Sequence, residues 1–187
     1  MPTLSRAEVL ALPELPFARP TSSLSEARIV SQTMTSHRQS QFSQALSGRI
    51  MTKATGAQWF EMHLTFSPMR AEQALRMIGF LEKMQGRIGY CRIPLFPDAG
   101  SSDLTVGSYV NYSNHSKLYV VTSLSGASPT VAPRPLNEGG SLIVPSTSSR
   151  DDHLVYMAAS LKSDHQSIEV KPDGLNHINL TFIERLE

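Results

Sequence analysis

Hydrophobic and polar residues alternate most regularly between positions 59 and 66. Phe60, Met62, Leu64 and Phe66 fall on one side of this segment, and mostly polar residues fall on the other. A period of two is typical of a β-strand with one buried face. The segment therefore predicts a central strand whose apolar side faces the core.

Two other segments are expected in the same sheet. Residues 177–186 place Ile178, Leu180 and Phe182 on one side, and this run is as apolar as the first, so we expect it to return to the first sheet. Residues 47–53 are the expected partner strand, across a turn near Gly56.

A helix is predicted over residues 69–85. Ser67 is suited to cap free amides, and Pro68 suits the first turn of a helix. Gly86 is the expected C-cap. The apolar positions follow at helical spacing and are Ala71, Ala74, Leu75, Ile78 and Leu81.

The remaining segments favour short strands. Residues 87–96 and 154–161 are strand-like, whereas residues 104–144 hold short apolar runs separated by Gly, Ser, Asn and Pro. We expect a mainly β fold: a β-sandwich-like domain with one α-helix, made from residues 45–100 and 151–187, plus a small inserted β-barrel-like lobe over residues 101–150.

Residues 1–44 contain four prolines and then a stretch rich in Ser, Thr and Gln. Such a segment has little apolar content with which to fold alone. We expect an extended N-terminal arm, with a disordered tail as the alternative.

Composition narrows the choice of partners. Charged residues make up 18% of the chain, and 17 Lys and Arg against 16 Asp and Glu leave a net charge of +1. No run of like charges is present, so no nucleic-acid specificity is expected. The single cysteine, Cys91, favours a reducing compartment. With neither a secretory signal nor a long apolar stretch, we expect a soluble protein made in the cytoplasm, without membrane insertion.

The sequence lacks the common motifs of catalysis. Its six histidines, His63, His115 and His153 among them, show no metal-ligand spacing, and no Gly-x-Ser-x-Gly or phosphate-binding glycine pattern occurs. We expect no catalytic residue, no metal site and no cofactor. A hydrolase with an unrecognised site is an alternative.

The order of the elements and a few short motifs carry a resemblance. The motifs are Ser47-Gly48-Arg49, Gln58-Trp59-Phe60-Glu61-Met62, Ser67-Pro68, Phe80-Leu81, Pro94 and Leu180-Thr181-Phe182-Ile183-Glu184-Arg185-Leu186. In this order they resemble the N-terminal part of distal tail proteins and related minor tail proteins of tailed bacteriophages. The middle segment, residues 106–136, looks like the insertion of such proteins.

The resemblance implies a virion structural protein without an active site. Its subunits would form a cyclic homo-oligomer, typically a hexamer, that joins the tail tube to tail-tip hub proteins or the baseplate. A ring uses two different surfaces of each subunit. The residues expected at subunit interfaces are Trp59, Met77, Met84, Arg38 and Arg49.

Two alternatives from the sequence remain open. A carbohydrate- or receptor-binding β-module would use Tyr109, Tyr112 and Tyr119 as stacking residues. Another virion adaptor or a head-decoration protein would equally account for the polar N-terminal segment.

Overall fold

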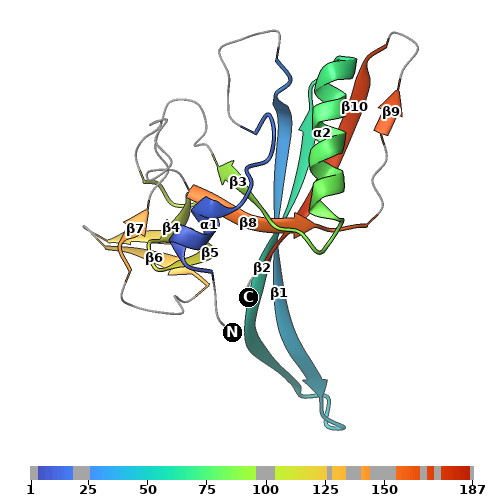
Figure 1. Cartoon of the computed structure of the whole chain (residues 1–187). Helices are drawn as coiled ribbons and strands as arrows, with labels where there is room; N and C mark the ends of the chain where they lie inside the picture. The colour runs from blue at the N-terminus through green and yellow to red at the C-terminus, as the bar shows by residue number, and fades with distance from the viewer. Residues whose placement is uncertain are drawn as a thin grey trace.

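The computed structural model describes residues 4–18, 26–95, 104–125, 128–133, 140–143, 155–164, 168–170 and 174–185. The fold is mainly β, as the sequence predicts (Figure 1). The described residues form two sheets and two helices. The elements are α1 (Arg6–Ala11), β1 (Ile29–Gln44), β2 (Ile50–Phe66), α2 (Ala71–Met84), β3 (Cys91–Leu95), β4 (Tyr109–Tyr112), β5 (His115–Ser125), β6 (Ser128–Ala132), β7 (Leu142–Ile143), β8 (Val155–Leu161), β9 (Ile168–Val170) and β10 (Asn176–Glu184).

The larger sheet has the strand order β1-β2-β10-β8-β3, and β9 pairs with β10 beside this path. Strand β10 returns to pair antiparallel with β2, which confirms the expected return of the last strand. The expected pairing of residues 47–53 across Gly56 is wrong. Those positions from Ile50 onward belong to β2 itself, and the partner of β2 is β1.

Helix α2 covers one face of this sheet, and its first turn is stabilised by Gln73, whose Oε1 accepts the amide of Arg70 at 3.1 Å. The helix ends at Gln85, which takes a left-handed conformation with φ of 51°. Met77 and Met84 are buried in the core beneath α2. An interface role, expected of both residues, would need them exposed, but helical spacing places them beside Leu81 on the inward face.

The smaller sheet has the order β6-β5-β4-β7 and is curled like half of a barrel. Val110, Tyr119, Val121 and Val131 form a core of its own. It packs on the larger sheet, where the rings of Tyr109 and Phe60 meet edge to face at 5.8 Å. Strands β4 to β7 lie within residues 101–150, where the inserted lobe is expected.

The N-terminal segment is not one extended arm. Helix α1 begins at a capping box, in which Ser5 and Glu8 bond each other's backbone amides. Its Val9 packs on Tyr156 and Ala158 of β8. Farther along, residues 29–44 are strand β1.

The thiol of Cys91 is buried in β3, and burial raises its pKa. We expect no reaction with a thiol reagent such as DTNB in the folded protein, and full reaction once urea unfolds it, since the thiolate is the nucleophile. Rapid reaction at neutral pH without denaturant would contradict this burial.

Candidate functional site: a projecting β-arm and its buried root

Strands β1 and β2 form a hairpin that extends well beyond the sheet. Strand β10 pairs with β2 from Thr65 only as far as Glu61. Between Ile50 and Phe60, β1 is the one described strand that pairs with β2. We call residues 38–58 the arm; it projects away from the body (Figure 1).

A tight turn closes the tip of the arm. The amide of Gly48 donates to the carbonyl of Ala45 at 2.9 Å, and the amide of Ala45 donates to the carbonyl of Arg49 at 2.9 Å. Gly48 has a φ of 78°, in the left-handed region that favours glycine. Leu46 in this turn is fully exposed. The turn fixes the register of the two arm strands.

The register gives the arm two different faces. Phe42 lies opposite Thr52 and Gln44 opposite Ile50, so one face is uncharged and carries two large apolar side chains. Phe42 is 65% exposed and Ile50 is 59% exposed. Large apolar side chains of this kind are usually buried, but no other described element covers this uncharged face.

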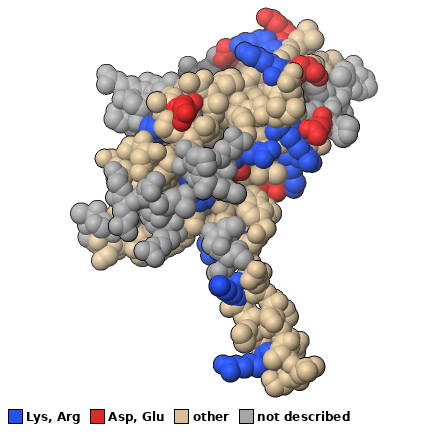
Figure 2. Space-filling model, turned by 60° about the horizontal axis from the view of Figure 1, so that its bottom comes forward, with Lys and Arg blue, Asp and Glu red and all other residues tan. Residues whose placement is uncertain are grey.

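The opposite face is basic. Arg49, Met51 and Lys53 alternate along it, with Met51 62% exposed. No Asp or Glu occurs between Ala27 and Phe60. Figure 2 shows the arm standing clear of the body with blue Lys and Arg and no red on the visible side. Its positive charge is therefore not neutralised within the arm.

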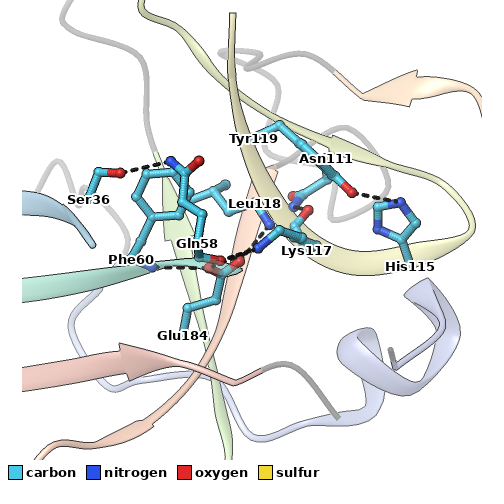
Figure 3. A network of polar contacts seen from close by, with 9 residues as sticks. All are labelled: Ser36, Gln58, Phe60, Asn111, His115, Lys117, Leu118, Tyr119 and Glu184. Atoms are coloured by element: carbon cyan, nitrogen blue, oxygen red, sulfur yellow. Dashed lines mark hydrogen bonds and ion pairs between the residues drawn. The ribbon is translucent and has the colours of Figure 1, made fainter. Parts of the chain in front are cut away.

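A buried ion pair holds the root of the arm (Figure 3). The Nζ of Lys117 lies 3.8 Å from Oε2 of Glu184 and donates to the carbonyl of Gln58 at 2.7 Å. Glu184 also accepts the amides of Phe60 at 3.1 Å and Leu118 at 2.7 Å. These side chains provide hydrogen-bond partners for the backbone of β2 where its pairing with β10 ends, and they connect that part of β2 to β5.

Burial governs the charge of this pair. It raises the pKa of Glu184 to about 7, although the Lys117 ammonium and the two amide donors favour the carboxylate. Burial likewise lowers the pKa of Lys117, against the attraction of Glu184. The two side chains are almost fully enclosed. The pair therefore lies between the sheets and has no opening to a substrate.

The outer face of the sheet carries a second, more open cluster at the root. Glu61 accepts from the Nζ of Lys162 at 2.6 Å and lies 3.0 Å from Nε2 of His37. The His37 ring stacks on Trp59 at 5.4 Å. These contacts, led by the Lys162 hydrogen bond, lower the pKa of Glu61. The cluster joins β1 to β2 and to the residue after β8.

The structure separates the residues expected at interfaces. Arg38 and Arg49 lie exposed on the arm, and Trp59 is half-buried at its root. Met77 and Met84 are enclosed by the chain's own core, so they offer no surface to a neighbour. The sequence therefore predicts interface residues on the arm and at its root, but it does not predict the exposed apolar side chains of the arm.

The three tyrosines considered for ligand stacking do not form an open platform. Tyr119 is buried, and the half-buried Tyr112 meets it edge to face at 5.3 Å. Tyr109 packs on Phe60. Their rings contribute to the core of the smaller sheet and to its contact with the larger one.

The sequence does not predict a functional role for several residues of the arm and its root. They are Phe42, Leu46, Ile50, Met51, Lys117 and Glu184. The absence of Asp and Glu over residues 27–60 is the one sequence signal for the arm. No local pattern identifies Lys117 and Glu184, because the contact forms between distant parts of the chain: Leu118 and Glu184 are 66 positions apart.

Within the described ranges, no three His, Cys, Asp or Glu side chains form a group that could hold a metal ion. In the same part of the chain, no helix combines the length and hydrophobicity needed to cross a membrane. No protein-family model matches the sequence, and no curated protein matches it.

Proposed function

We propose that this chain is a virion structural protein of a phage tail. Copies of it would form a ring at the distal tail or tail tip and join the tail tube to the tip or baseplate. The observation that carries the proposal is the arm, a long projecting hairpin with an exposed apolar face. The mainly β fold is also the fold class that the resemblance to distal tail proteins implies.

The arm has the properties of an unfilled interface. An isolated two-stranded hairpin is only marginally stable in water, and free strand edges invite pairing with other chains. Strand β1 has 16 residues, contains no proline and carries Arg38 as its one charged residue apart from histidine. Because such an edge would promote uncontrolled association, we propose that a neighbouring subunit covers the arm.

The position of the arm favours a ring or another head-to-tail assembly. It projects from one end of the molecule, away from α2 (Figure 1). A contact between two different surfaces is heterologous, and repeated heterologous contacts close into rings when the rotation permits. Each subunit would then supply an arm to one neighbour and receive one from the other.

The uncharged face of the arm, which carries Phe42 and Ile50, provides the test. We expect the wild-type protein to form oligomers in size-exclusion chromatography with light scattering, and rings in negative-stain electron microscopy. The double variant Phe42→Ser/Ile50→Ser should raise the dissociation constant by tenfold or more, about 1.4 kcal/mol, because it removes apolar area from the contact. Both side chains are exposed, so circular dichroism and Tm should stay close to wild type.

Val106→Ser is the matched control, since Val106 is equally exposed but precedes the smaller sheet. It should assemble as the wild type does. A wild-type protein that stays monomeric from micromolar to millimolar concentration would overturn the proposal.

A further inference from the structure

The outward side of α2 presents an unusual row of side chains. Glu72, Leu75, Gly79 and Glu82 follow at spacings of three, four and three residues, so they lie along one side of the helix. Leu75 is 66% exposed, and Glu72, Gly79 and Glu82 are exposed too. The row therefore has an apolar centre with a carboxylate at each end.

Gly79 has no internal reason to be glycine. It lies in the middle of a helix of 14 residues, where glycine is less favourable than alanine. A Cβ placed on it would meet no atom within 4 Å, and it has no positive φ. A helical glycine without a packing role inside its own chain suits the close approach of another chain.

The basic face of the arm complements this row. Arg49, Met51 and Lys53 give a cation, an apolar side chain and a cation in turn. Positions 49 and 53 are separated by about 13 Å along a strand, since a strand rises about 3.3 Å per residue. Positions 72 and 82 are separated by about 15 Å along a helix, since a helix rises 1.5 Å per residue. The two spacings match closely enough for both cations to reach carboxylates while Met51 meets the apolar centre.

We infer that the basic face of the arm docks on the Glu72–Leu75–Gly79–Glu82 row of α2 in a second copy of this chain. The inference rests on the proposed assembly and names the surface that receives the basic face of the arm; the uncharged face with Phe42 and Ile50 makes a separate contact. The arm and α2 lie at opposite ends of the molecule, so an arm cannot reach its own helix (Figure 1). The contact is head-to-tail, as a ring requires.

Two cations lie on the neighbouring side of α2. The guanidinium of Arg76 lies over the Phe17 ring at 5.2 Å and so is directed onto the body. Lys83 is exposed beside Glu82. Arg76 is one turn from Glu72, and Lys83 is one turn from Gly79, so both cations border the row on one side. An arm that approaches from the other side, where Leu75 and Glu82 lie, meets these two residues before it reaches either cation.

Charge reversal tests the pairing. The variants Arg49→Glu/Lys53→Glu and Glu72→Lys/Glu82→Lys should each weaken assembly about tenfold or more, measured by light scattering at 50 mM salt, where surface charges are weakly screened. Combining all four changes should restore assembly to within about threefold of wild type. In the control, Arg38→Glu replaces the two arm changes and should not rescue the α2 variant. If the combined variant assembles no better than its parents, the inference is overturned.

Gly79→Ala is expected to change monomer stability and assembly in opposite directions. It should raise the Tm of the dilute monomer by about 2–4 °C, because alanine is the better helix former. It should nevertheless weaken assembly about tenfold, because the added methyl group holds the arm away. A variant that is stabilised and assembles normally would contradict the docking at α2 but leave assembly itself intact. A wild-type protein that never assembles would instead overturn the proposed function.

Discussion

Replacing Glu184 with alanine is expected to lower the free energy of unfolding at pH 8 by about 3–5 kcal/mol, because the carboxylate is ionised there and the change breaks a buried ion pair. The change leaves the amides of Phe60 and Leu118 without their acceptor and leaves the Lys117 ammonium buried beside the carbonyl of Gln58. Urea unfolding followed by circular dichroism measures the loss. Since the pair joins the two sheets, we also expect the arm to lose its fixed root.

Glu61→Ala is the matched control for this change. Glu61 also pairs with a lysine, Lys162, and contacts a second side chain, His37, but it lies at the surface of the sheet. Ion pairs at the surface contribute at most about 1 kcal/mol, so Glu61→Ala should be much milder. Equal losses for the two variants would show that burial of the Lys117–Glu184 pair has no special weight.

The sequence predicts the elements that bury one face. The alternation over residues 59–66 and the spacing of apolar residues in 69–85 both correspond to the observed β2 and α2. Strand β10 is equally clear, because Ile178, Leu180 and Phe182 point into the core. In β2 and β10 the pattern follows from burial, which is what a hydrophobic period records. In α2 the spacing places the helix but not its buried face, because Leu75 is exposed whereas Met77 and Met84 are buried.

Strand β1 shows where this reasoning fails. Its residues are largely Ser, Thr and Gln, and most of them are exposed, so no period reveals the strand. What forms β1 is its backbone pairing with β2 over nearly its whole length. Because backbone hydrogen bonding leaves no mark on composition, the same segment also fits an unstructured arm.

The residues of the candidate site cannot be predicted from the sequence for a related reason. Lys117 and Glu184 look like ordinary surface charges, and only the packing of β5 against the end of β10 encloses them. Met77 shows the opposite error: the sequence predicts it at a subunit interface, but it is buried in the core beneath α2. Long-range packing decides both outcomes.

The root and the arm have complementary mechanical roles. Side chains of Lys117, Glu184 and Glu61 fix the hairpin where it leaves the sheet, whereas nothing in the described chain covers the arm beyond it. An arm whose direction is set before binding loses less entropy on docking than a free segment. This arrangement supports the proposed assembly, because each subunit presents its arm in one orientation.

Stability is expected to depend on pH through Glu184 in the range from about 4.5 to about 7. Burial raises its pKa from 4.5 to about 7, so in this range the folded chain holds a proton that the unfolded chain releases. The stabilisation from this group is therefore fully present below pH 4.5 and is lost as the pH rises to about 7. Over that range the loss should be on the order of 3 kcal/mol, since one pKa unit corresponds to about 1.4 kcal/mol.

Comparison with Glu184→Gln isolates this contribution. The buried His115 has a lowered pKa, which makes stability rise with pH below its ordinary value of 6.5, and Lys117 titrates at higher pH. His115 is not coupled to Glu184, so its contribution largely cancels in the difference between the two proteins, whereas Lys117 loses the attraction of Glu184 in the variant and its pKa falls further. Urea unfolding from pH 4.5 to 8 should show wild type losing stability relative to Glu184→Gln as the pH rises. Parallel profiles would mean that Glu184 stays ionised in the folded chain, held so by Lys117 and the two backbone amides.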